Sequence, residues 1–211
     1  MGSRAFVDHA LTELARSGWS PAGWGHFLAD SLHRSLREAL KRPGAMVELA
    51  LIHLLGLTRG RRRWALASWL LTLLHLGLLG EHRDLGWANR VTLVRALLPA
   101  SDMPAAQLAG LALATDVADG WLARREGETS FGAFADALAD VSFWTWFALR
   151  FEPSRVLRLA ALSAWAAPAL AITAAYFARG GTVDRPRPVA GRYASMALQM
   201  LLAGRSVRAR R

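Results

Sequence analysis

The sequence contains no cysteine and only one lysine, Lys41. The absence of cysteine excludes a disulfide framework and thiolate chemistry. The N-terminal stretch carries acidic residues and lacks a long apolar run, so it does not predict a cleaved signal peptide. No internal repeat, low-complexity linker or domain boundary is visible, and 211 residues therefore predict one domain.

Positive charge and apolar residues are both abundant. The net charge is +10, and 53% of the residues are hydrophobic. A basic chain of this kind is suited to nucleic acid, to an anionic membrane surface or to a phosphorylated substrate. The arginines stand between apolar runs rather than in one patch, which argues against nucleic acid. The sequence therefore predicts a lipid bilayer and a phosphate-bearing ligand as its partners.

The apolar segments predict an all-α fold, a polytopic membrane helical bundle of about five to six spans. A span needs about 20 apolar residues. The candidates are 64–80, 104–123, 132–149, 156–178 and the weaker 189–204, with the short apolar segment 44–57 as a further, doubtful one.

Residues 23–41 predict an amphipathic helix, because leucines recur every four residues. We expect this helix to lie in the membrane interface. A soluble helix packed on its neighbours is the alternative interpretation. The repeated leucines are Leu28, Leu32, Leu36 and Leu40.

Four aspartates stand between the most hydrophobic segments, in two pairs. Asp116 and Asp119 are three residues apart, and Asp136 and Asp140 are four apart, so a helix would place each pair on one face. A charged residue at the centre of a membrane helix costs about 2.5–3.5 kcal/mol. A divalent cation shared by two adjacent helices would compensate this cost. The hard oxygen ligands indicate Mg²⁺ or Mn²⁺.

Small residues and an arginine accompany the acids. Gly120 and Ala123 follow the first pair, Gly132 stands one turn before the second, and Arg124 lies beside the gap, where it can neutralise a phosphate. This combination indicates a pyrophosphate rather than a bare cation. A proton relay or ion pathway is the alternative for intramembrane acids, but it does not account for the small residues and the arginine.

These residues form a pattern that resembles a known signature. "DVADGWLAR", seven further residues and "GAFADALAD" resemble the signature of the CDP-alcohol phosphatidyltransferases, with all eight signature residues present. "NRVTLVR" at 89–95 resembles a stretch that precedes the family's core, and "GRYASMALQM" at 191–200 resembles a later segment, with Arg192 in place of lysine. The resemblance covers 89–204. It leaves 1–88 as an N-terminal part with an interfacial helix and extra hydrophobic helices, and 205–211 as a basic tail.

The resemblance implies a membrane transferase of phospholipid biosynthesis. Such an enzyme moves a phosphatidyl group from a CDP-alcohol, here expected to be CDP-diacylglycerol, to a small alcohol and releases CMP. We expect a homodimer in a bacterial plasma membrane, with the active site facing the cytoplasm and no nucleic-acid partner. The alternative function is a catalytically inactive member of the family that binds or transports divalent cations.

The resemblance also assigns roles to residues. Asp116, Asp119 and Asp136 are expected to bind metal, and Asp140 to complete the metal site and act as general base. Arg187 and Arg192 are expected to face a phosphorylated acceptor, with membrane-surface charge as the alternative role. The residues expected to bind CDP are Gly120, Ala123, Arg124, Gly132, Asn89 and Thr92.

The spacing before the first acid limits the topology. Only 20 residues separate Arg95 from Asp116, which is enough for one span or for a short helical hairpin broken at "PASDMP". We expect a hairpin that turns near Pro104 and places Asn89–Arg95 beside the site.

Overall fold

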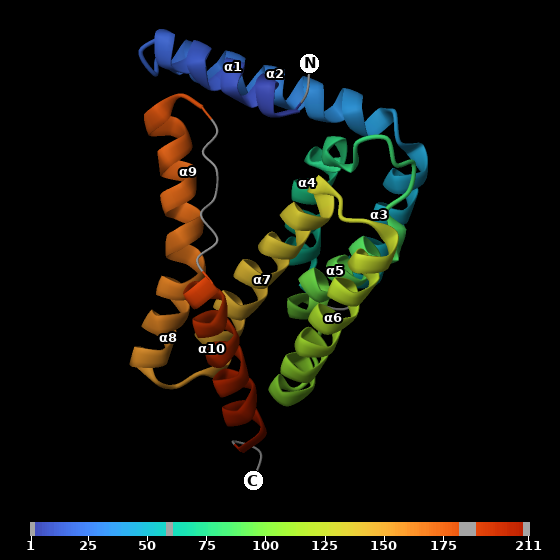
Figure 1. The fold of residues 1–211 in the computed structure, drawn as a ribbon, viewed down its shortest axis with the longest axis vertical. Helices are drawn as coiled ribbons and strands as arrows, with labels where there is room; N and C mark the ends of the chain where they lie inside the picture. The colour runs from blue at the N-terminus through green and yellow to red at the C-terminus, as the bar shows by residue number, and fades with distance from the viewer. Residues whose placement is uncertain (1–2, 58–60, 182–188, 209–211) are drawn as a thin grey trace.

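The structure is a computed structural model, and it describes residues 3–57, 61–181 and 189–208. These residues form helices and no strand (Figure 1), which confirms the predicted all-α class. The α-helices are α1 (Ser3–Arg16), α2 (Pro21–Leu40), α3 (Pro43–Leu57), α4 (Arg62–Leu74), α5 (Gly86–Leu97), α6 (Ala105–Glu126), α7 (Ser130–Phe151), α8 (Arg155–Ala161), α9 (Ala167–Arg179) and α10 (Val189–Arg208). Short 3₁₀ helices cover Leu76–Leu79 (η1) and Leu98–Ala100 (η2), and a π-helical turn covers Leu162–Ala166 (η3).

The two N-terminal helices lie across one end of the molecule (Figure 1). Helix α2 begins at Pro21, and the Ser20 hydroxyl accepts a hydrogen bond from the Gly23 amide at 3.1 Å, which satisfies an amide that the helix leaves unpaired. Aromatic rings near the start of α2 meet Phe177 of α9, with ring centroids of Trp24 and Phe177 5.4 Å apart. The predicted helix over 23–41 is present. Its location in a membrane interface stays a prediction.

Helices α3 and α4 form a hairpin that returns the chain to the end of α2. The Arg42 guanidinium donates to the Gly80 carbonyl, and the Ala45 amide donates to the Arg83 carbonyl at 3.1 Å. The predicted span over 64–80 is therefore corrected, since α4 ends at Leu74 and η1 follows. The chain leaves the α-helix at His75, whose ring stacks on Phe134 of α7 at 3.9 Å between centroids. With 13 residues, α4 is about 20 Å long, which is less than the apolar thickness of a bilayer.

Helices α5 and α6 form the hairpin predicted near Pro104. The amide of Ala88, near the start of α5, donates to the Glu126 carboxylate at the end of α6 at 3.2 Å, so the two helices run antiparallel. A short connection then leads to α7, whose first turn is capped by the Thr129 hydroxyl. Helices α6 and α7 have 22 residues each, about 33 Å, whereas α5 has 12.

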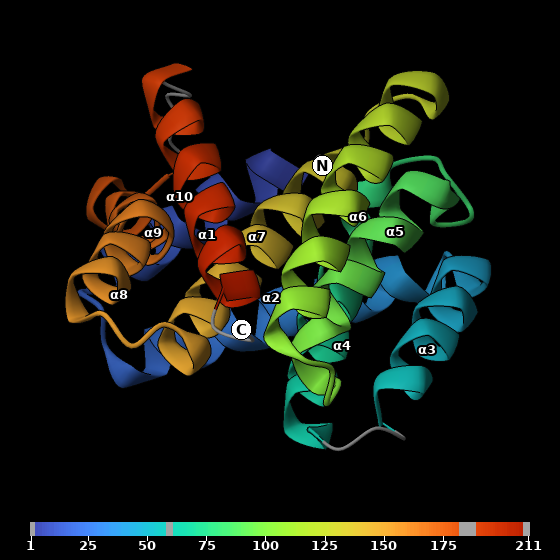
Figure 2. The same cartoon turned by 90° about the horizontal axis from the view of Figure 1, so that it is seen from below.

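Helix α7 lies between two groups of helices (Figure 2). The α5–α6 hairpin is on one side and α8, α9 and α10 are on the other. One face of α7 forms the largest buried cluster with α6, η3 and α10, in which alanines of α6 let aromatic side chains of α7 pack closely. This cluster includes Leu108, Ala109, Ala112, Phe143, Trp144, Phe147, Trp165 and Leu202.

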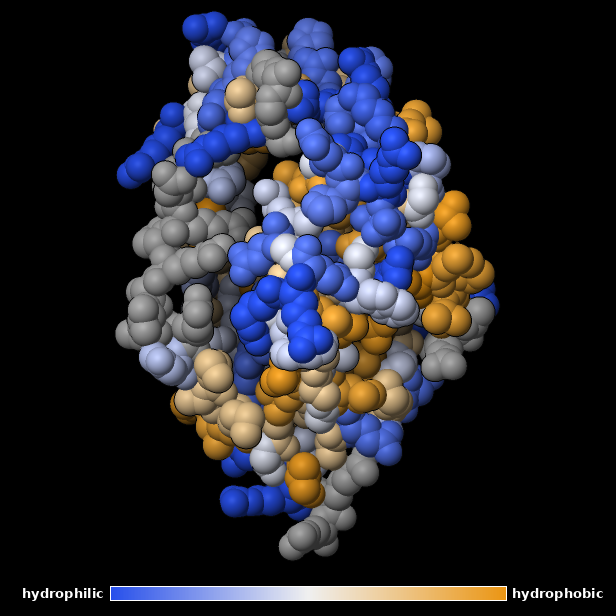
Figure 3. Space-filling view, turned by 45° about the vertical axis from the view of Figure 1, so that its right-hand side comes forward, coloured by the Kyte–Doolittle hydropathy of each residue, from blue (hydrophilic) through white to orange (hydrophobic). Residues whose placement is uncertain are grey.

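The structure gives the predicted membrane spans partial support. The continuous helix Arg155–Arg179 is the one helix among the described residues that has the length and hydropathy to cross a membrane, and only 11% of its most apolar window is buried. Large apolar side chains are exposed on many other helices, including Leu51 of α3, Leu70 of α4 and Met200 of α10. In Figure 3 hydrophilic residues gather toward the end covered by α1 and α2 and again in the middle of the face, and hydrophobic residues lie mainly along its right-hand side and below the middle. The number of spans stays a prediction.

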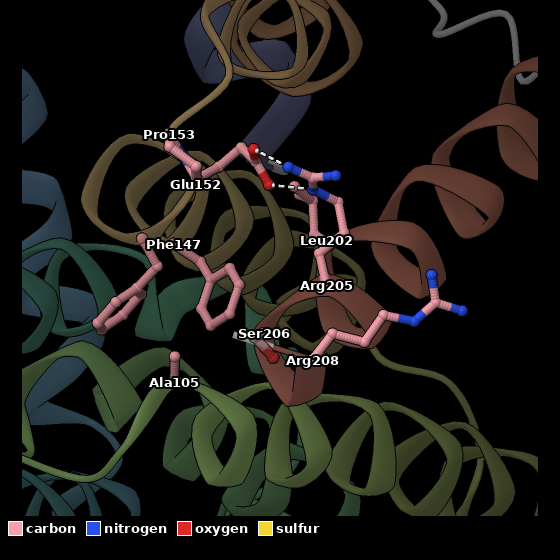
Figure 4. Close-up of a pocket in the computed structure, with 9 residues that line it drawn as sticks. Ala105, Phe147, Glu152, Pro153, Leu202, Arg205, Ser206 and Arg208 are labelled. Carbon is pink, nitrogen blue, oxygen red and sulfur yellow. Dashed lines mark hydrogen bonds and ion pairs between the residues drawn. The ribbon is translucent and has the colours of Figure 1, made fainter. Parts of the chain in front are cut away.

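An ion pair between the buried Glu152, just after α7, and the exposed Arg205 of α10 lies at the end of the molecule away from α1 and α2 (Figures 1 and 4). The Glu152 side chain is 4% exposed, and both of its carboxylate oxygens accept hydrogen bonds from Arg205, at 2.8 and 3.0 Å. The Arg205 hydrogen bond holds the pKa of Glu152 below its ordinary value. Apolar residues, including Phe147 and Leu202, line the cavity of about 530 Å³ beside the pair.

We expect Glu152→Gln to lower the free energy of unfolding by about 1–3 kcal/mol, because it removes a charge-assisted bidentate contact. Thermal unfolding in detergent micelles measures this. The loss should shrink as the pH falls through the lowered pKa of Glu152, because the protonated wild-type side chain is then uncharged, as glutamine is. Glu13→Gln is the control, because Glu13 pairs with Arg16 at the surface, and we expect a change below about 0.5 kcal/mol. Equal effects of the two substitutions would contradict a stabilising role of the Glu152–Arg205 ion pair.

Candidate metal and nucleotide site

The two predicted acid pairs converge in the structure. Asp116 and Asp119 lie on α6, and Asp136 and Asp140 lie on α7, with α5 packed against both helices. One carboxylate oxygen each from Asp116, Asp136 and Asp140 lies within 4.8 Å of the other two. The helical spacing of three and four residues thus brings carboxylates from two helices to one place.

Arg95 of α5 lies against all four acids. Its side chain is 0% exposed, and its Nη1 is 2.7 Å from Asp116 Oδ1. Its Nη2 is 3.1 Å from Asp119 Oδ2 and also contacts Asp136 Oδ1, and its Nε is 3.5 Å from Asp140 Oδ1. Sequence reasoning named this arginine only as part of the 89–95 stretch and gave it no role. The spacing of Arg95 could have indicated a role in the site, because Asn89, Thr92 and Arg95 recur every three residues and share one face of a helix.

The four carboxylates differ in their surroundings. Asp119 is directed inward, with 8% of its side chain exposed, and its Oδ2 accepts a 2.6 Å hydrogen bond from the Thr92 hydroxyl. The side chains of Asp116 and Asp136 are about half exposed, at 45% and 50%. Asp140 is intermediate at 28%, and its buried Oδ1 accepts no hydrogen bond from the residues that the structure describes. One side of the cluster therefore faces the interior and the other faces outward.

Gly132 allows α5 to approach α7. A β-carbon at this position would lie 2.6 Å from Asn89 Oδ1 and 3.2 Å from Thr129 Oγ1. Asn89 is itself buried, and its amide donates to the Leu85 carbonyl at 2.6 Å. The sequence predicted that Gly132 leaves room for a nucleotide. In the structure, the space beside this glycine is occupied by Asn89.

The predicted nucleotide residues of α6 are partly or fully exposed, whereas Thr92 of α5 is buried. A β-carbon on Gly120 would have only one neighbour within 4 Å, Arg124 Nη1 at 3.5 Å, so this surface is open. Arg124 is exposed, and Ala123 is partly exposed. Of the two arginines predicted to face an acceptor, Arg187 lies outside the described residues. The backbone of Arg192 belongs to α10, and its side chain lies outside the described part of the structure.

The residues present fit a divalent cation. The donors are carboxylate oxygens, which Mg²⁺ and Mn²⁺ prefer, and three of them already lie within reach of one ion. Two of those acids, Asp116 and Asp136, have half of their side chains exposed, which gives an ion access from outside the bundle.

A comparison with protein-family models matches residues 87–205 to CDP-alcohol phosphatidyltransferase. The chain belongs to the CDP-alcohol phosphatidyltransferase family. Its members are phosphotransferases that move a phosphatidyl group from a CDP-alcohol. Searches of curated proteins and of solved structures found no match. In this CDP-alcohol phosphatidyltransferase, the matched range contains the four acids, Arg95, all of α6 and α7, and α5 from its second residue onward.

We expect Gly132→Ala to lower the free energy of unfolding by about 1–3 kcal/mol, because the new methyl group overlaps the Asn89 side chain. Adding Asn89→Ala should recover part of this loss by removing the overlapping atom. Thermal unfolding of the single and double variants tests both statements.

Gly110→Ala on α6 is the matched control, since nothing lies within 4 Å of a β-carbon there. Alanine is the better helix former, so we expect unchanged or slightly higher stability. If Gly132→Ala changed the stability no more than Gly110→Ala does, the close approach of α5 to α7 at Gly132 would be contradicted.

Proposed function

We propose that the protein is an integral membrane enzyme that transfers a phosphatidyl group from CDP-diacylglycerol to a small alcohol and releases CMP. The observation that carries this proposal is the convergence of the motif acids of α6 and α7 in a chain of this family. The activity would depend on Mg²⁺ or Mn²⁺ and would serve phospholipid biosynthesis.

The surface of the molecule supports a bilayer as its environment. Exposed leucines, valines and methionines cover α3, α4, α8 and α10, and a soluble protein rarely exposes so much apolar surface. A donor with two acyl chains would reach an embedded site from within the bilayer. We place the protein in the bacterial plasma membrane, with the end that carries the α6–α7 connection at the cytoplasm.

The acids are proposed to hold the metal. Asp116, Asp136 and Asp140 would supply ligand oxygens, and Asp119 would join them from the interior side. A bound divalent cation would neutralise the charge of the pyrophosphate and stabilise the phosphate that leaves with CMP. The open surface at Gly120, Ala123 and Arg124 would receive the nucleotide, with the Arg124 guanidinium on a phosphate. Asn89 and Thr92 would act indirectly, by holding Gly132 and Asp119 in place.

Asp140 is proposed as the general base. Its side chain is 28% exposed, so the carboxylate has the capacity to reach the acceptor hydroxyl and accept its proton. The acceptor oxygen then bonds to the phosphorus that carries diacylglycerol. The bond from that phosphorus to the bridging oxygen of CMP breaks, and CMP leaves with the bonding electrons. Arg187 and Arg192 are proposed to favour a phosphorylated acceptor, and the active form is proposed to be a homodimer.

Release of CMP from CDP-diacylglycerol tests the activity. Purified protein in mixed micelles with Mn²⁺ and a panel of acceptors (glycerol 3-phosphate, inositol phosphate and serine) should release CMP with at least one of them. We expect Asp119→Asn to lower the rate by about 10–100-fold, because it weakens the set of metal ligands.

Asp102→Asn is the control for this substitution. Asp102 is an exposed aspartate in the turn before α6, so its loss should leave the rate unchanged. No CMP release with any acceptor, or an equal rate for wild type and Asp119→Asn, would favour the alternative function, an inactive cation-binding or transport protein.

CDP alone should raise the thermal unfolding temperature only when a divalent cation is present, because a metal would bridge the acids to the pyrophosphate. The measurement compares CDP with Mn²⁺, CDP with a chelator, and Mn²⁺ without nucleotide. Protection by CDP that persists in the chelator would contradict a metal-bridged pyrophosphate.

A further inference from the structure

Arg95 contacts the acid cluster from the interior of the protein. Its side chain is 0% exposed, whereas those of Asp116 and Asp136 are about half exposed. One oxygen of each of the four carboxylates points to its guanidinium. An ion that enters from outside would therefore meet the acids on the side opposite to the arginine.

The arginine offsets part of the repulsion within the cluster. Four carboxylates that share one site destabilise one another, and a buried carboxylate without a partner is costly. The planar guanidinium has five N–H donors, so one side chain can serve several carboxylates at once. Arg95 uses Nη1 and Nη2 in this way, and its Nε lies 3.5 Å from Asp140 Oδ1 without a hydrogen bond.

We propose that Arg95 is a permanent internal counterion of the four acids. It holds the carboxylates together in the metal-free protein and limits how tightly they bind a divalent cation. This inference rests on the proposed metal site and gives that site a regulator of its affinity.

The direction of the effect follows from the charges. A divalent cation among the acids is repelled by the guanidinium that the same acids contact. Without the arginine this repulsion disappears, and the acids repel one another more strongly until the metal arrives. Both consequences favour metal binding, so loss of the arginine should tighten it. A residue that served only to pack α5 would give no such change.

Arg95→Gln in the full chain tests the proposal, with Mn²⁺ as the probe. Mn²⁺ binding is followed by electron paramagnetic resonance of the free ion, and thermal unfolding is measured in a chelator and in saturating Mn²⁺. We expect the dissociation constant for Mn²⁺ to fall by about tenfold or more. The unfolding temperature should drop in the chelator, and most of the loss should be recovered in Mn²⁺.

Two other variants separate charge from packing. Arg90→Gln removes an arginine of the same helix that pairs with Glu48, away from the acids. It should lower the unfolding temperature equally in chelator and in Mn²⁺ and leave Mn²⁺ affinity unchanged. Arg95→Lys keeps the positive charge but loses the planar guanidinium with its several N–H donors. It should therefore retain Mn²⁺ affinity within about threefold and unfold at a lower temperature than the wild type in the chelator.

The outcomes distinguish a failure of the proposed metal site from a failure of the counterion role. If wild-type protein does not bind Mn²⁺, the proposed metal site is wrong. If the wild type binds Mn²⁺ and Arg95→Gln binds it equally or more weakly, the site stands and the counterion role is overturned. The role is also overturned if Arg95→Lys tightens binding as much as Arg95→Gln does. Failure of Arg95→Gln to fold even in saturating Mn²⁺ counts against it too, because the ion should replace the missing charge.

Discussion

Four carboxylates close together in an apolar helical bundle repel one another, and the structure is arranged around the arginine that offsets this repulsion. Arg95 reaches all four because α5 packs against both α6 and α7. A buried cluster of charge is tolerated only when partners and hydrogen bonds compensate the lost hydration. The position of α5 is therefore a requirement of the site as well as a feature of the fold.

Several local features serve that position. Gly132 allows Asn89 to lie against α7, Glu126 accepts a hydrogen bond from an amide in the first turn of α5, and Thr92 binds Asp119. Each of these contacts joins α5 to α6 or to α7. Together they fix the height of Arg95 along the two longer helices, and so they fix which oxygens it contacts.

The N-terminal region supports the same helix from its other side, although most of it lies outside the family match. Glu48 of α3 forms a 2.8 Å ion pair with Arg90, and the indole of Trp64 on α4 donates to the Ala96 carbonyl at 2.8 Å. The α3–α4 hairpin thus closes the face of α5 that the acids do not cover. Its helices of 15 and 13 residues are too short for two full spans and suit a role as packing around the core.

The sequence by itself determined the helical class, the pairing of the acids and the hairpin at Pro104. These depend on helical periodicity and on chain length, which are local properties. The family could be recognised for the same reason, because its motif lies within 25 consecutive residues. The break at His75 was not predicted, since the apolar run continues through it.

Only the tertiary structure decided what lies next to the acids. The occupant of the space at Gly132 and the partner of Asp119 come from α5, which is distant along the chain. The burial of Arg95 was likewise invisible, because a sequence shows its spacing but not which helices surround it. The reason is physical: a charge as costly as a buried guanidinium is tolerated only through contacts with other helices, and those contacts exist only once the helices have packed.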